Sequence, residues 1–162
     1  MTKEWKIAAS ERGVTQLSLC RSRANQEPGL REVNRRSEDS LARAKKELRD
    51  YFAGRLKSFS VRYDIAGLSS FTQAVLKEAA KIPYGQVRTY RWLATRLGKP
   101  KAARAVGNAL ARNPVPIIIP CHRVVRADGT IGPFALGSGT KKRLLELEKS
   151  FVKTKASSRN AA

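Results

Sequence analysis

The chain contains few cysteines, a single histidine and no long apolar segment. Its two cysteines, Cys20 and Cys121, are too few in 162 residues for a disulfide framework, which is typical of a reducing compartment. Because no run of about 18 apolar residues occurs, we expect no membrane span, and the first residues lack the apolar core of a secretion signal. One histidine and two distant cysteines give no zinc-ligand spacing, so we expect no metal site. We therefore expect a protein that is not secreted.

Acidic residues are also scarce. The chain has 13 Asp and Glu against 33 Lys and Arg, which gives a formal net charge of +20. The excess is uneven, because residues 1–65 carry a net charge of +6 and residues 66–162 carry +14. A strongly basic field attracts polyanions through counterion release. We therefore expect a nucleic acid partner in preference to a generally basic surface without one.

The only histidine lies directly after a cysteine, in the segment Pro120-Cys121-His122-Arg123-Val124. A thiol becomes a good nucleophile as its thiolate, which a neighbouring base or cation favours. Taken alone, a Cys-His pair is more typical of a buried structural cysteine. Only the surrounding sequence can therefore indicate whether Cys121 is reactive. Cys20 lies in a strand-like run and is expected to be an inert, packed thiol.

The first part of the chain is predicted to be a small β-rich layer with one helix. Residues 3–9 and 15–21 alternate as two strands around a turn at 10–13, and residues 59–65 alternate as a third strand. A helical pattern starts at Ser37 and is expected to stop at Gly54. No catalytic constellation is visible here, so we expect a supporting role. The residues that share the apolar face of the helix are Leu41, Ala44, Leu48, Tyr51 and Phe52.

The second part is predicted to be mostly helical. Ser70 and Gln73 match a capping box at the start of one helix. Residues 89–97 and 101–112 then form two short helices that are joined at residues 98–100. This arrangement suits a helix-turn-helix and, on pattern alone, an ordinary helical pair equally well.

The helix predicted at 101–112 has small side chains and a basic ridge. Ala103, Val106 and Leu110 fall on one face and are expected to pack inward. A helix with so little bulk can approach the narrow minor groove of DNA, where base readout is poor. We therefore expect sequence-tolerant DNA binding, with phosphate contacts from Arg and Lys. The residues that recur every four positions on the polar face are Arg104, Asn108 and Arg112.

Several segments of the chain resemble segments of the O6-alkylguanine-DNA alkyltransferases (methylated-DNA–protein-cysteine methyltransferases). They occur in the same order as in that family. The most specific is 119–124, which is similar to the active-site motif of that family. The similarity covers about residues 5–150 and is strongest after residue 70. The other matching segments are 51–54, 82–87 with Thr89-Tyr90, 102–107 and 113–116.

The resemblance implies that Cys121 accepts the alkyl group by in-line attack on the carbon bound to O6 of guanine. His122 would act through a water molecule as the base, and Glu148 would orient and charge-stabilise it. Asn113 would brace the turn that presents the cysteine. Tyr90 would protonate N3 of the leaving guanine. Arg123 is expected to be structural, paired with a carboxylate or a carbonyl.

The resemblance also implies base flipping, because an enclosed thiolate cannot reach O6 inside a stacked duplex. Arg104 would take the place of the rotated nucleotide. The flipped guanine would contact the backbone carbonyls of Cys121 and Val124, the backbone N–H of Ala135 and the ring of Phe134. The implied DNA-contacting residues are Thr89, Tyr90, Lys101, Ala103, Arg104, Asn108 and Arg112.

One loop departs from the family pattern. Where the family has Gly-Tyr followed by Gly-Gly, residues 132–137 read Gly-Pro-Phe-Ala-Leu-Gly. Phe134 keeps an aromatic wall without a hydroxyl, while Pro133 and Leu136 replace glycines and make the loop stiffer and bulkier. We expect a pocket that is less tolerant of large O6 substituents such as benzyl. The zinc ligands of some relatives have no counterparts here.

The expected fold class is α+β, with three parts. A ribonuclease-H-like antiparallel sheet with a helix (1–66) precedes a winged-helix-like, helix-turn-helix domain that carries the alkyl acceptor (67–151), and a disordered basic tail (152–162) follows. The implied activity is irreversible, single-use removal of alkyl groups from O6-alkylguanine, and from O4-alkylthymine, in duplex DNA, without a cofactor. We expect a monomer, with cooperative binding to DNA left open. A DNA partner implies a location in the prokaryotic cytoplasm, associated with the nucleoid, or in the eukaryotic nucleus.

Two other functions fit parts of this sequence. A non-catalytic module that recognises lesions and recruits repair factors would lack the reactive cysteine. A Cys-His hydrolase of acidic substrates would leave the helix-turn-helix unexplained.

Overall fold

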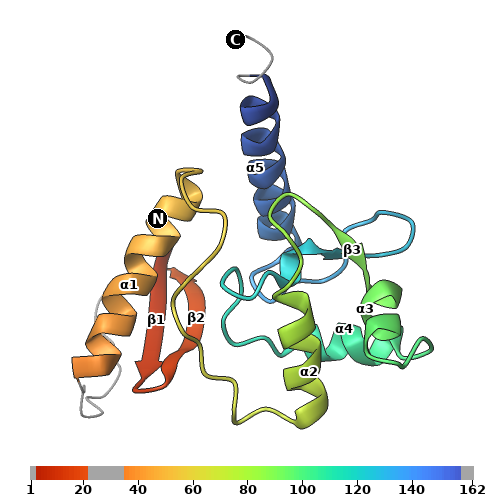
Figure 1. The fold of residues 1–162 in the computed structure, drawn as a ribbon, viewed down its shortest axis with the longest axis horizontal. Helices are drawn as coiled ribbons and strands as arrows, with labels where there is room; N and C mark the ends of the chain where they lie inside the picture. The colour runs from red at the N-terminus through yellow and green to blue at the C-terminus, as the bar shows by residue number, and fades with distance from the viewer. Residues whose placement is uncertain (1–2, 22–34, 158–162) are drawn as a thin grey trace.

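Two groups of elements make up residues 3–21 and 35–157, the part of the chain that the computed structural model describes (Figure 1). The segment between α1 and α2 connects them and passes along the face where they meet. The first group consists of β1 (Lys3–Ser10), β2 (Gly13–Arg21) and α1 (Arg35–Phe52). The second consists of α2 (Ser70–Ala79), β3 (Arg88–Thr89), α3 (Tyr90–Arg96), α4 (Ala103–Ala111), the 3-10 helix η1 (Cys121–Arg123), β4 (Val124–Val125) and α5 (Ser138–Ser157).

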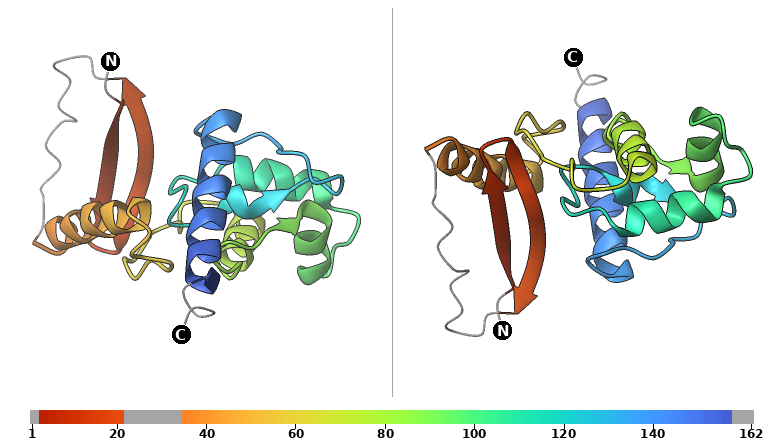
Figure 2. Two further views of the ribbon diagram at one scale, coloured as in Figure 1. Left: turned by 90° about the horizontal axis from the view of Figure 1, so that it is seen from above. Right: turned by 90° about the horizontal axis from the view of Figure 1, so that it is seen from below.

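The N-terminal group is an antiparallel hairpin crossed by α1 (Figure 2). The predicted strands and turn are confirmed, and Gly13 at the turn has a φ of 137°, which favours glycine. The apolar face of α1 is confirmed in part, because Ala44, Leu48 and Tyr51 are buried whereas Phe52 is exposed and stacks on Trp5. The helix ends before Gly54, as predicted.

The predicted strand at 59–65 is wrong. Its backbone pairs with the hairpin only around Val14, whose N–H donates to Arg62 and whose carbonyl accepts from Asp64. The N–H groups of Ser60 and Val61 donate instead to the carboxylate of Glu47 on α1, at 2.9 and 3.0 Å. A buried side chain thus satisfies the donors that a sheet neighbour would otherwise take.

The helices of the second group begin close to their predicted starts, with two corrections. The N-cap of α2 is Ser69, whose hydroxyl accepts from the N–H of Thr72, while the Gln73 amide donates to the carbonyl of Leu68. The predicted capping box at Ser70 is therefore one residue too late. The helix predicted from residue 101 begins at Ala103, because residues 99–102 form a turn that is closed by a bond from the N–H of Ala102 to Lys99.

Helices α3 and α4 pack together as a helix-turn-helix, with α2 against α4. On α4, Val106 and Leu110 point inward as predicted, but Ala103 is only partly buried, and Ala109 is buried in addition. Next to this pair, β3 and β4 form a short parallel ladder that joins Arg88 to Val124 and Thr89 to Val125. The ladder brings the start of α3 beside the segment that contains the Cys-His pair.

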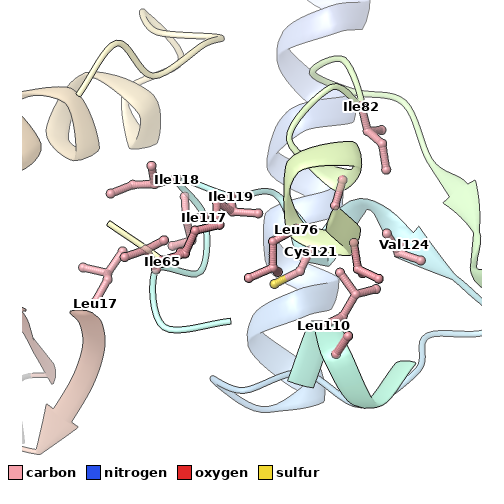
Figure 3. Packing of buried hydrophobic residues seen from close by; sticks show 14 of the residues in the cluster. Leu17, Ile65, Leu76, Ile82, Leu110, Ile117, Ile118, Ile119, Cys121 and Val124 are labelled. Carbon is pink, nitrogen blue, oxygen red and sulfur yellow. The ribbon is translucent and has the colours of Figure 1, made fainter. Parts of the chain in front are cut away.

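A continuous apolar cluster links the two groups (Figure 3). It runs from Leu17 on β2 through Ile65 and the buried segment 117–119 to Cys121, Leu110 and Val124. The backbone follows the same route, because the N–H of Leu17 donates to the carbonyl of Pro114 at 2.7 Å. The cysteine segment is thus positioned by the packing of both groups.

Helix α5 continues to Ser157, so residues 152–157 are helical and the prediction of a disordered tail from residue 152 is wrong for them. Residues 158–162 lie outside the described part of the chain. Mixed helices and a small antiparallel sheet confirm the α+β class. Within the described ranges, no helix is long and apolar enough to cross a bilayer.

Candidate active site

Cys121 starts η1 at the end of the buried segment 117–120, and only 4% of it is exposed. Its sulfur is held by Asn113, whose Nδ2 donates to Sγ at 3.0 Å and to the carbonyl of Ile119 at 3.1 Å. The Oδ1 of the same amide accepts from the N–H of Val115 at 3.0 Å. One buried amide therefore ties the end of α4 to both sides of the turn that presents the thiol.

The backbone of this turn is strained. Ile117 has a φ of 77°, a left-handed conformation that a β-branched residue rarely adopts. Such strain persists only where the surrounding structure enforces it, and it concentrates at functional sites. Here the enforcement comes from burial of the Ile117 side chain and from the contacts of Asn113 on both sides of it.

Burial opposes ionisation of the thiol. It raises the pKa of Cys121 to about 11, against the lowering effects of the Asn113 hydrogen bond and the charge of Lys141. Lys141 is itself 1% exposed, and its Nζ donates to the carbonyl of Val124 at 2.6 Å. Burial lowers the pKa of Lys141 to about 8, although the nearby Cys121 thiolate would raise it.

His122 and Glu148 form a fully buried pair. The Nε2 of His122 lies 2.9 Å from Oε1 of Glu148, and both side chains are completely shielded from solvent. Burial lowers the pKa of His122, while its bond to Glu148 acts in the opposite sense. The imidazole is therefore neutral at neutral pH. Its ring forms a T-shaped pair with the ring of Phe134, with the ring centroids 6.2 Å apart.

Glu148 accepts hydrogen bonds from four residues in three segments of the chain. Its carboxylate accepts from Nε2 of His122, from Nε and Nη2 of Arg123, from the N–H of Gly85 at 2.8 Å and from the hydroxyl of Tyr51 at 2.7 Å. Burial alone would raise the pKa of Glu148, but the bonds from His122 and Arg123 lower it to about 2. Arg123 also donates to the carbonyl of Ile82. Its predicted pairing with a carboxylate or a carbonyl is confirmed, since it has both partners.

These contacts assign the tautomer of His122. A carboxylate ionised at neutral pH can only accept, so the Nε2 that faces Glu148 must carry a proton. In a neutral imidazole the other nitrogen, Nδ1, then presents a lone pair. No described protein group bonds to Nδ1. Nδ1 is therefore the atom that can take up a proton.

The residues predicted to contact the guanine lie around this network. Tyr90 is half-buried at the start of α3, with its ring 5.8 Å from the Nζ of Lys141. Burial raises the pKa of Tyr90, so its hydroxyl is a proton donor at neutral pH. Val124 is buried and pairs with β3, Phe134 is half-buried and Ala135 is exposed.

The predicted DNA contacts lie mostly on one exposed surface. Arg104 and Asn108 are exposed on α4, Arg112 is exposed directly after it, and Lys101 is exposed before it. Thr89 serves as the N-cap of α3, where its hydroxyl accepts from the N–H of Trp92 at 3.1 Å. The hydroxyl of Thr89 therefore caps α3, a structural role that the sequence analysis did not predict.

Sequence reasoning missed two side chains of the network, Tyr51 and Lys141. Tyr51 was predicted to be a core residue of a supporting layer, whereas its hydroxyl reaches the carboxylate of Glu148. Lys141 carries no local signal of burial in a chain with so many cations. No group of three or more His, Cys, Asp and Glu that could hold a metal ion occurs in the described ranges.

A buried thiol beside a His–Glu pair, next to a helix-turn-helix with an exposed basic ridge, defines a cysteine-based protein that acts on nucleic acid. Residues 70–150 match the family described as 6-O-methylguanine DNA methyltransferase, DNA binding domain, and residues 5–65 match its ribonuclease-like domain. The chain belongs to the 6-O-methylguanine DNA methyltransferase family.

Individual relatives agree with this assignment. A methylated-DNA–protein-cysteine methyltransferase of Methanosarcina acetivorans is 46% identical over 114 residues, which cover 70% of this chain and 72% of the relative. One from Mycobacterium leprae is 45% identical over 71% of this chain and 69% of its own length. The crystal structure of Mycobacterium tuberculosis OGT in complex with DNA superposes with a TM-score of 0.77 at 38% identity, covering 91% of this chain and 87% of that one.

Proposed function

We propose that the protein repairs DNA by direct reversal, moving an alkyl group from O6 of guanine in duplex DNA to Sγ of Cys121. The observation that carries this proposal is the thiol itself, which Asn113 holds at 3.0 Å beside the buried His122–Glu148 pair. Membership of a family whose relatives are named methylated-DNA–protein-cysteine methyltransferases supports the same reaction.

The chemical step balances without a cofactor, because the lesion supplies the alkyl group. The thiol proton passes through a water molecule to Nδ1 of His122, and Glu148 stabilises the resulting imidazolium. The thiolate then forms a sulfur–carbon bond as the carbon–O6 bond breaks, and the electron pair of that bond stays on the guanine. A proton from Tyr90 to N3 makes the departing base neutral. The thioether is stable, so each molecule acts once.

The target base has to leave the duplex, because Cys121 is buried and O6 is stacked inside the helix. We propose that α4 enters the minor groove, with Arg104 in place of the rotated nucleotide. Lys101, Asn108 and Arg112 extend the same exposed surface toward the phosphates. This mode of binding is sequence-tolerant, which suits a protein that searches for lesions.

The flipped guanine would lie between Tyr90, Phe134 and the backbone near Val124. The Val124 carbonyl already accepts from Lys141, and its second lone pair remains for the guanine amino group. The backbone N–H of the exposed Ala135 would reach O6. We propose that the protein works as a monomer on double-stranded DNA, in whichever compartment holds that DNA.

The proposal is tested by the mass of the intact protein after incubation with duplex DNA that contains one O6-methylguanine. We expect a gain of about 14 Da on Cys121, one methyl per protein, and no gain for Cys121→Ala. A parallel duplex with O4-methylthymine tests the second substrate. Tight, lesion-selective binding without a mass gain would overturn alkyl transfer and favour a recruiting module.

A further inference from the structure

Tyr51 connects the N-terminal group of elements to the His122–Glu148 pair. It lies near the end of α1, yet its hydroxyl is 2.7 Å from Oε1 of Glu148 and 3.4 Å from Nε2 of His122. The residue is completely buried, and its ring is fixed among Phe52, Phe59 and Tyr84 at centroid distances of 5.4 to 5.8 Å. The hydroxyl therefore has one position available to it.

The direction of these hydrogen bonds follows from chemistry. Burial and the charge of Glu148 raise the pKa of Tyr51, so its hydroxyl keeps its proton and donates it to the carboxylate. The hydroxyl oxygen then turns a lone pair toward Nε2 of His122. Oε1 of Glu148 and the oxygen of Tyr51 thus face the same N–H group, one as the principal acceptor and the other as a secondary one.

We infer that Tyr51 is a positioning residue for alkyl transfer, through which the N-terminal domain orients the imidazole of His122 and sets its basicity. This inference rests on the proposed function for its catalytic consequence. Its structural part, the link between the Tyr51 hydroxyl and the state of His122, stands apart from the reaction.

The hydroxyl has a definite electrostatic effect. By donating to Glu148 it disperses the carboxylate charge that would otherwise stabilise the imidazolium. The other charged groups that act on His122 are Arg123 on its own segment and Lys141 on α5, and both disfavour its protonated form. Removing the Tyr51 hydroxyl therefore leaves a less dispersed carboxylate facing His122 and shifts protonation of the imidazole to higher pH.

Tyr51→Phe removes only the hydroxyl, and the chain offers a matched control. Tyr84 packs against the same ring of Tyr51, and its own buried hydroxyl bonds to no described group, so Tyr84→Phe deletes the same atom without breaking a hydrogen bond. In single-turnover transfer from O6-methylguanine DNA, we expect Tyr51→Phe to be slower by about three- to tenfold at neutral pH, equivalent to roughly one kcal/mol, because the loss of orientation of the imidazole outweighs its gain in basicity. The acidic limb of the pH–rate profile of Tyr51→Phe should move to higher pH, whereas Tyr84→Phe should behave as the wild type does.

The state of His122 can also be read without any reaction, because it is the only histidine in the chain. In nitrogen-15 spectra of histidine-labelled free protein, we expect a proton on Nε2 in the wild type and a higher titration midpoint in Tyr51→Phe than in Tyr84→Phe. An identical midpoint and an identical acidic limb in the two variants would overturn the inference. Absence of transfer in the wild type would defeat the proposed function and leave the spectroscopic comparison valid.

Should Tyr51→Phe fail to fold, fluorotyrosine incorporation into the full chain gives the opposite perturbation. Fluorination makes all four tyrosine hydroxyls stronger donors. The histidine midpoint should then fall in wild-type and in Tyr84→Phe protein alike. An unchanged midpoint would count against the role of Tyr51.

Discussion

The environment of the Cys121 thiol favours its neutral, unreactive form in the free protein. Burial and the apolar cluster around it favour the neutral thiol, whereas Asn113 and Lys141 favour the thiolate. The neighbours do not overcome burial in the free protein, since the pKa stays at about 11. In the proposed reaction, His122 therefore has to take up the thiol proton before the thiolate attacks. A buried, neutral thiol is less easily oxidised than an exposed thiolate, so the free protein keeps this cysteine reduced.

Replacement of Lys141 by methionine tests the electrostatic part of this balance. Lys141→Met keeps the aliphatic stem but removes the buried ammonium, so the pKa of Cys121 should rise further. Each unit of that rise costs about tenfold in thiolate population at neutral pH. We expect slower methyl transfer with little change in DNA affinity, measured by single-turnover kinetics and by titration with lesion-free duplex.

The control for this variant is Lys142→Met, which removes an exposed cation from the next position of α5. It changes the net charge by the same amount and leaves the buried group in place. Equal transfer rates in Lys141→Met and Lys142→Met would contradict a role for Lys141 in stabilising the thiolate.

At the scale of elements, the loop at 132–137 is the segment whose residues depart from the family pattern described in the sequence analysis. Pro133 is exposed, whereas Leu136 packs partly against the core, so the loop is tethered at a position where the family has a glycine. Gly132 is closely packed, because a Cβ there would collide with the hydroxyl of Tyr90. Rigid attachment on both sides of Phe134 limits how far this wall of the pocket can move.

The loop predicts a preference for small alkyl groups. A benzyl substituent needs the wall at Phe134 to retreat, whereas methyl does not, so O6-benzylguanine should react more slowly than O6-methylguanine relative to a family member with glycines here. Pro133→Gly should reduce the difference in rate between the two substrates by several-fold. The measurement is the ratio of the second-order rate constants for O6-methylguanine and O6-benzylguanine. Equal rates for both substrates in the unaltered protein would refute the expectation.

The same scale shows what sequence can predict in this chain. The hairpin, α1, α3 and the polar face of α4 follow from local periodicity and from residues such as Gly13 and Gly54, so they were predictable. The strand at 59–65 was not, because Glu47, more than ten residues away, takes its backbone donors. Cys121 and His122 were found from a motif, whereas Tyr51 and Lys141 were missed because their roles arise only when α1 and α5 pack against that motif.

At the scale of the whole molecule, the His122–Glu148–Arg123 network predicts sensitivity to acid. The pKa of Glu148 is lowered from 4.5 to about 2, so its contribution to stability is present above pH 4.5 and is lost as the pH falls toward 2. His122 has a pKa lowered from 6.5, so its buried neutral form begins to cost stability as the pH drops below that value. Both groups act in the same direction.

We therefore expect the free energy of unfolding to decline below about pH 6.5 and more steeply below 4.5, with Glu148 accounting for roughly 3 kcal/mol. Urea unfolding at a series of pH values measures this curve. Glu148→Gln should make the free energy of unfolding less dependent on pH below pH 4.5. Glu146 is an exposed residue of the same helix, so Glu146→Gln should leave the curve unchanged. A flat wild-type curve between pH 6.5 and 3 would show that the network does not carry the pH dependence.

Alkylation itself should destabilise the folded protein, because both groups of elements pack against the segment that bears the thiol. The Cys121 side chain shares a buried cluster with Leu76, Leu110 and Val124, and Asn113 already occupies one direction at the sulfur (Figure 3). An added methyl in such a core costs about 1–3 kcal/mol through displaced side chains. That cost corresponds to a fall in Tm of roughly 2–10 °C for a chain of this size.

Calorimetry of the protein before and after reaction, with DNA removed, measures the change, and Cys121→Ala exposed to the same DNA is the control. A Tm that is unchanged or raised would mean that the pocket accommodates the methyl without strain.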